Sequence, residues 1–156
     1  MSKRTTRNLT AALLLAACST ALGVENTAQI PAAAEELMRM YPGAAVHKEQ
    51  NRVRIIYGVP MTPGLDARGA AESFIQMHGQ AFGCGTLSVL PDWNADFADG
   101  SKTVFIYQQY LAGLPVEYGC LKVLVLNGPV PRVIYAAGTL APAPADAVFP
   151  PEKLDG

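Results

Sequence analysis

The hydrophobic and polar positions of the chain follow a helical period in one segment and a strand period in several others. Between Asp66 and Gly83, apolar residues recur at helical spacing, which predicts the main helix of the protein. Asp66 is expected to be its N-cap and Gly83 its left-handed terminator. The expected apolar face consists of Ala70, Ala71, Phe74, Ile75, His78, Ala81 and Phe82. A histidine on this stripe is expected to pack in the core or at its boundary rather than to transfer protons.

A period of two predicts strands on both sides of the main helix. Alternating residues flank the polar pair Gln50-Asn51 over positions 46–57, which indicates a small hairpin. After Gly83 the strand-like runs cover residues 87–90, 103–111, 116–126 and 132–140, with turn residues between them. Pro91 is expected to end the first run. This order of elements predicts an α+β domain, in which an antiparallel sheet buries one face on the helix.

The first apolar stretch has the organisation of a targeting signal. Lys3, Arg4 and Arg7 precede an apolar run over residues 9–17 that is too short to span a bilayer. Residues 15–18, Leu-Ala-Ala-Cys, resemble the bacterial lipobox, in which the signal is cut before the cysteine and the thiol receives a lipid. This pattern predicts a lipid anchor on Cys18 and a place in the bacterial cell envelope. The alternatives are an ordinary secretion signal cut shortly after Cys18, and a buried hydrophobic helix.

The composition divides the chain into four segments. We expect a signal peptide over 1–17, a tether over 18–30, one domain over 31–142 and a Pro-rich linker or tail over 143–156. A short helix is expected over 32–40, because Pro31 suits a first helical turn. Such a chain is long enough for one domain with a core.

Charge and residue counts narrow the function classes. The 156 residues have a formal net charge of −1, and removal of residues 1–17 takes away three positive charges and leaves −4. Without a basic cluster, nucleic acid is not an expected partner. The two histidines, His47 and His78, and the lack of paired metal-ligand spacing argue against a metal site. No nucleophile and base stand together, so the sequence predicts neither a cofactor nor an enzyme.

The roles expected for the three cysteines depend on where the signal peptide is cut. If Cys18 carries a lipid, Cys84 and Cys120 remain as an even pair in an oxidising compartment. A disulfide between them is one expectation. Two buried thiols that pack as small apolar groups are the other.

One constellation resembles a known family. The main helix is followed by Phe105-Ile106-Tyr107-Gln108-Gln109-Tyr110, Gly113-x-Pro115-Val116, Tyr118-Gly119, an apolar run over 121–125 and Gly138-x-Leu140-x-Pro142. In order and spacing this is similar to the fungalysin/thermolysin propeptide family over residues 50–142. The resemblance implies a cystatin-like helix-on-sheet fold and a proregion module that assists folding of a secreted zinc metalloprotease or keeps it inactive. The family's catalytic His-Glu-x-x-His does not occur in this sequence.

The motif residues also have a physical interpretation of their own. Gly113-Leu114-Pro115 predicts a tight reversal, and Gly119 inside a strand predicts a bulge or a close backbone approach. Gln108, Gln109 and Tyr110 fit either cross-strand pairing on a half-solvated face or contact with a partner. Tyr107, Tyr110, Tyr118 and Tyr135 fit either packing or an aromatic patch. The candidates for partner binding are Tyr107, Gln109, Tyr110, Gly113, Pro115, Val116 and Gly119.

Three functions follow as hypotheses. The first is a non-catalytic, envelope-anchored or secreted module that binds, inhibits or assists folding of a secreted zinc metalloprotease in trans. The second is the truncated front of a metalloprotease precursor with no independent activity. The third is a structural or adhesive surface module. A membrane is expected as a partner only through the lipid anchor.

Overall fold

A computed structural model describes residues 29–83, 89–111 and 113–141 of the chain. The expected signal peptide, most of the tether, Cys18, Cys84 and the Pro-rich tail lie outside these residues. The elements in chain order are α1 (Gln29–Met40), β1 (Ala45–Glu49), β2 (Arg52–Tyr57), α2 (Ala67–His78), a short 3-10 turn η1 (Gly79–Phe82), β3 (Val89–Asp96), β4 (Lys102–Leu111), β5 (Leu114–Leu126) and β6 (Arg132–Gly138).

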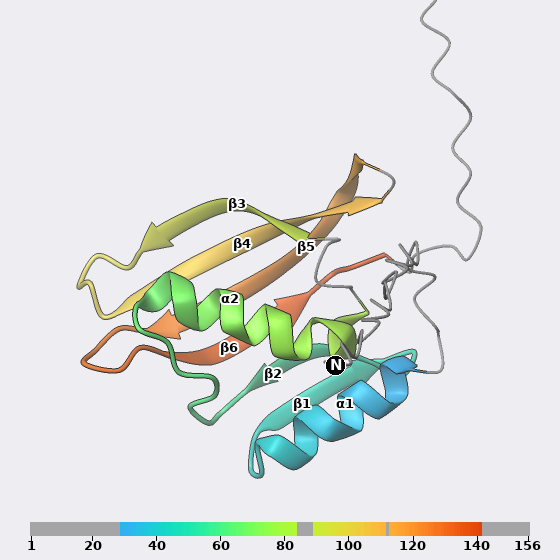
Figure 1. The fold of residues 1–156 in the computed structure, drawn as a ribbon, viewed down its shortest axis with the longest axis horizontal. Coiled ribbons are helices and arrows are strands. Elements are labelled where there is room, and N and C mark those ends of the chain that lie inside the picture. Colours follow the sequence, from blue (N-terminus) through green and yellow to red (C-terminus); the bar gives the residue numbers. More distant parts are fainter. Residues whose placement is uncertain (1–28, 84–88, 112, 142–156) are drawn as a thin grey trace, which may run out of the picture.

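The strands form one antiparallel sheet that confirms the expected α+β class. Its six strands lie in the order β1-β2-β6-β5-β4-β3, so β1 and β3 are the edges. Both helices lie on the same face of this sheet, with α2 across β4, β5 and β6 and α1 beside β2 (Figure 1). The result is a two-layer arrangement in which the described helices cover one face of the sheet.

The main helix begins and ends at the residues that its sequence predicts. Asp66 is extended, and its carboxylate accepts a 2.7 Å hydrogen bond from the amide of Gly69, as an N-cap does. The α-helical part stops at His78, and the 3-10 turn η1 completes the element. Gly83 then terminates it with φ of +85°, in the left-handed region that glycine enters without strain. The seven residues of the expected apolar face are all buried.

The expected hairpin is also present as β1 and β2. Gln50 and Asn51 connect the two strands, and both have positive φ, as a two-residue hairpin turn of this hand requires. In the segment of the expected short helix, α1 begins at Gln29, so Pro31 lies in its first turn.

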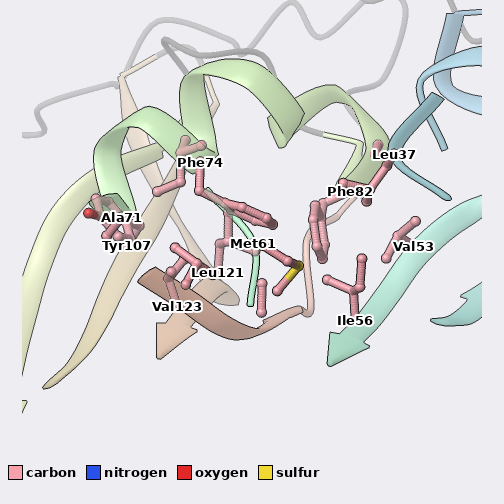
Figure 2. Close-up of a cluster of buried hydrophobic side chains, with 14 of the residues drawn as sticks. Leu37, Val53, Ile56, Met61, Ala71, Phe74, Phe82, Tyr107, Leu121 and Val123 are labelled. Atoms are coloured by element: carbon pink, nitrogen blue, oxygen red, sulfur yellow. The ribbon is translucent and has the colours of Figure 1, made fainter. Parts of the chain in front are cut away.

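The core lies between the helices and the sheet. Phe74 and Phe82 point from the helical layer toward the strands, with ring centroids 6.1 Å apart (Figure 2). Met61, from the connection between β2 and α2, lies among them and is 1% exposed. The sheet contributes residues such as Ile56, Leu121 and Val123, each 0% exposed. Apolar side chains from both layers therefore fill one continuous core.

The expectation that Pro91 ends its strand is wrong. The strand β3 continues through Pro91 to Asp96, and its register shifts between Pro91 and Trp93. Because β3 is an edge strand, Pro91 can occupy it with no ladder partner on its outer side, and the bulge absorbs the irregularity. Residues 84–88, which include the start of the expected run, lie outside the described part.

Candidate functional site

The motif residues from Phe105 to Gly119 lie on the hairpin that β4 and β5 form. Gly138 ends β6, Leu140 follows it, and Pro142 lies outside the described residues. Gln108 pairs with Cys120 and Tyr110 with Pro115, so residues 116–119 of β5 stand opposite Gln109 alone. This four-residue bulge requires unusual backbone angles, and Tyr118 has φ of +58°. Gly113 has φ of +82° in the expected tight reversal. The motif therefore encodes an irregular hairpin rather than a plain two-stranded ladder.

The side chain of Gln108 connects the two ends of the bulge by hydrogen bonds. Its Nε2 donates hydrogen bonds to the backbone carbonyl oxygens of Val116 at 2.6 Å and Gly119 at 3.1 Å. The same nitrogen lies 3.0 Å from the carbonyl oxygen of Gln109. One side-chain amide thus supplies donors for carbonyl groups that the interrupted ladder leaves unpaired.

Gln109 joins the hairpin to the chain that leaves the sheet after β6. Its Oε1 accepts from the amide of Ala141 at 2.9 Å, and its Nε2 donates to the carbonyl oxygen of the same residue at 3.0 Å. The side chain is 1% exposed. Gly119 packs against it so closely that a Cβ atom there would lie 2.8 Å from Oε1 of Gln109. The expected close backbone approach at Gly119 is confirmed.

The candidates for partner binding separate into an interior and an exterior group. Tyr107, Gln109 and Gly119 are buried, so their side chains or backbone form the interior of the hairpin. Tyr110 and Val116 are partly exposed, and Gly113 and Pro115 are exposed. Two neighbouring residues are exposed as well: Leu114, at 55%, and Tyr118, at 84%. The exposed end of the hairpin, residues 110–111 and 113–118, is here named the hairpin tip.

The four tyrosines, for which the sequence allowed either packing or an aromatic patch, do not form one patch. Tyr107 lies on the helix-covered face, with its hydroxyl group buried and without a hydrogen-bond partner among the described residues. Burial raises the pKa of Tyr107 to about 12, with the Glu72 carboxylate adding to the rise and Arg68 opposing it. Tyr135 lies on the opposite face, and Tyr118 lies at the hairpin tip.

His78 is a core histidine, as its place on the helical stripe predicts. It is 4% exposed, and its Nε2 lies 2.9 Å from the hydroxyl of Tyr41, which in turn lies 2.9 Å from Oγ1 of Thr62. The rings of Tyr41 and Phe74 contact it edge-on. Burial lowers the pKa of His78, and the charge of Glu36 opposes this shift.

Cys120 is half-buried on β5, with its Sγ 3.5 Å from Oγ1 of Thr139. Cys84, the other member of the expected pair, lies outside the described residues. The disulfide between them therefore stays a prediction.

A shallow cavity of about 560 Å³ lies at the start of α2. Asp66 is the one ionisable residue among those that line it, and its Oδ1 accepts the capping hydrogen bond from Gly69. Within the described ranges, no cluster of three or more His, Cys, Asp or Glu residues could hold a metal ion, and no helix is long and apolar enough to cross a membrane. The cavity is lined by Pro63, Gly64, Leu65, Asp66, Gly69 and Ser73.

Comparisons with known proteins give no relative for this chain. No family model, no curated protein and no solved structure matches it. The α+β class is thus defined by the fold alone.

A second surface, which was not predicted from the sequence, lies on the face of the sheet opposite the helices. It is here named the open face and consists of three cross-strand rows. The first row is Trp93, Ile106, Lys122, Ala137, Ile55 and His47. The second row is Ala95, Val104, Leu124, Tyr135, Tyr57 and Ala45. The third row is Lys102, Leu126 and Arg132, with Phe97 beside Lys102.

A signal for this surface exists in the sequence. Residues 104–107 and 123–126 are runs of consecutive apolar residues rather than alternating ones. Such runs are typical of strands that are covered on both faces. In the described structure the helices cover one face only, which leaves Trp93 54% and Tyr57 50% exposed.

Proposed function

We propose that this chain is a non-catalytic, propeptide-like module with a cystatin-like arrangement of helix and sheet, which binds a secreted zinc metalloprotease in trans. Its action on the protease is inhibition or assistance in folding. One observation carries the proposal. The signature residues between Phe105 and Gly119 lie in a single hairpin, where Gln108 bridges the bulge and Gln109 anchors Ala141.

The division of the motif into interior and exterior residues supports a binding role for the hairpin tip. The interior residues fix the shape of the hairpin, while Leu114 and Tyr118 project their side chains into solvent. Large apolar and aromatic groups are the ones that contribute most to protein interfaces. We therefore assign contact with the protease to the hairpin tip, with Leu114, Pro115 and Tyr118 as its main residues.

We further propose that the module acts in the bacterial cell envelope through a lipid on Cys18, or as a secreted protein if the signal is cut elsewhere. Mass spectrometry of the mature protein tests this step. The wild-type chain is expected to begin at Cys18 with the added mass of a lipid. A Cys18→Ser variant is expected to lack that mass, and an unmodified wild-type chain would contradict the anchor.

The experiment that tests the function is an inhibition and binding assay on a panel of purified secreted zinc metalloproteases, thermolysin included. The protein is expected to slow at least one enzyme or to form a complex with it. Leu114→Ser is expected to weaken that effect by about tenfold, since an exposed apolar contact at an interface core contributes on the order of 1–2 kcal/mol. Leu65→Ser is the matched control, because Leu65 is fully exposed but distant in sequence from the tip. Absence of binding across the panel would refute the proposal.

A further inference from the structure

The open face combines apolar character with a one-sided charge. Its first two rows are apolar except for Lys122 and His47, and its third row adds Lys102 and Arg132. The three rows contain no aspartate or glutamate. Lys102, Lys122 and Arg132 form no ion pair within the part of the chain that the structure describes. Hydrogen bonds from Ser101 lower the pKa of the nearby Asp99 carboxylate, and the charge of Lys102 helps to lower it. A chain with a formal net charge of −1 thus carries a face on which Lys122 and Arg132 have no carboxylate partner among the described residues.

From these charges and this apolar surface we propose that the open face binds an acidic amphipathic helix of a partner protein. The apolar stripe of that helix lies on the first and second rows, and its carboxylates face Lys122 and Arg132. The opposite face of the same strands packs a helix in this way, because α2 lies across β4, β5 and β6 (Figure 1). The apolar residues at the centre of the first two rows are partly exposed, and Trp93 and Tyr57 are exposed. Contiguous apolar surfaces of this kind mark interaction sites. The inference concerns a second surface and does not rest on the proposed binding of a protease.

The charges favour a helix of a partner over the other possible occupants. A second copy of the chain would place one open face on another, and the lysines and arginine of both would meet without carboxylates between them. A membrane would have to receive Lys122, which lies in the middle of a row between Ile106 and Ala137. Surfaces that insert into lipid place their cations on the polar side instead. A protein with acidic groups among apolar ones satisfies both features of the face.

The intrinsic fluorescence of Trp93 provides a direct measurement. Trp93 is the one tryptophan of the chain, and it lies in the first row of the open face. The probes are two synthetic amphipathic helices with identical leucine stripes, one with glutamate and the other with lysine beside the stripe. The glutamate peptide is expected to shift the Trp93 emission to shorter wavelength in a saturable manner, whereas the lysine peptide is expected to leave it unchanged.

Charge reversal on the face then tests the mechanism. Lys122→Glu is expected to weaken binding of the glutamate peptide by about tenfold or more, because like charges would then face each other. The same variant is expected to permit binding of the lysine peptide, because the new carboxylate would face its lysines. Lys48→Glu is the matched control, since Lys48 is exposed on β1 outside the three rows. Circular dichroism establishes that both variants remain folded.

Several results would overturn the inference. These are no response to the glutamate peptide, equal response to both peptides, and unchanged affinity in Lys122→Glu. A blue-shifted Trp93 emission in the dilute protein alone would mean that the chain covers its own face, and an emission that depends on protein concentration would mean that a second copy does. Binding to anionic phosphatidylglycerol vesicles without binding to the peptide would identify a lipid surface instead. The Leu114→Ser assay on proteases is independent of all these outcomes.

Discussion

Gly119 and Gln109 are in such close contact that only a residue without a side chain fits opposite the buried carboxamide. A Cβ atom at position 119 would lie 2.8 Å from Oε1 of Gln109 and 2.9 Å from Cβ of Val116. The contact places Gln109 where it bonds both the amide and the carbonyl of Ala141. One glycine in β5 therefore determines how the chain leaves the sheet after β6.

Gly119→Ala is expected to destabilise the protein by ~1–3 kcal/mol, because the added methyl group overpacks a site that cannot expand without breaking the Gln109 bonds. Urea unfolding measures the change. Gly128→Ala is the matched control, since a Cβ at position 128 has no neighbour within 4 Å. Its stability is expected to stay within ~1 kcal/mol of the wild type. An equal loss in both variants would contradict the role assigned to the contact.

Gln109→Leu is expected to cost ~1–3 kcal/mol, because it leaves the backbone amide and carbonyl of Ala141 without their partners. Amide hydrogen exchange gives the local readout. The Ala141 amide is expected to exchange faster in this variant than in the wild type, while amides in α2 keep their relative protection. Gln76→Leu, on the exposed side of α2, is the control and is expected to leave Ala141 unaffected.

The stability of the protein is expected to fall as the pH decreases through 6.5, because of His78. Burial lowers the pKa of this histidine below its ordinary value of 6.5 in the folded state only. The unfolded chain therefore takes up a proton first, and the free energy of unfolding decreases until the lower pKa of the folded state is reached. The stabilisation is fully present above pH 6.5.

His78→Phe tests this dependence by urea unfolding at several pH values. The variant loses the hydrogen bond to Tyr41, but that hydroxyl keeps Thr62 as a partner. The stability is expected to vary less with pH near 6.5 than in the wild type. His47→Gln is the control, since His47 is exposed on the edge strand β1, outside the core that surrounds His78. An unchanged slope in His78→Phe would refute the assignment.

Tyr107→Phe is expected to leave the protein at least as stable as the wild type. The hydroxyl of Tyr107 is buried without a partner among the described residues, and an unpaired buried hydroxyl costs ~1–3 kcal/mol. Tyr41→Phe is the matched opposite, because the Tyr41 hydroxyl bonds Thr62 and His78. It is expected to lose ~1 kcal/mol in thermal or urea unfolding. A large loss of stability in Tyr107→Phe would show that this hydroxyl has a partner after all.

The sequence by itself determined the elements that local rules define. The main helix follows from its apolar stripe, its Asp66 cap and its Gly83 terminator, which all act within a few residues of one another. The hairpin around Gln50 and Asn51 is equally local. For these segments the pattern contains the physical cause of the structure.

Only the tertiary structure decided that β3 continues through Pro91, that Gln109 is buried and that the open face exists. Pro91 is tolerated because β3 is an edge strand, and the strand order that makes it an edge depends on pairings far apart in sequence. Gln109 is buried because Ala141, 32 residues away, supplies its partners. The open face exists because both described helices pack on one side of the sheet, a choice that no local pattern specifies.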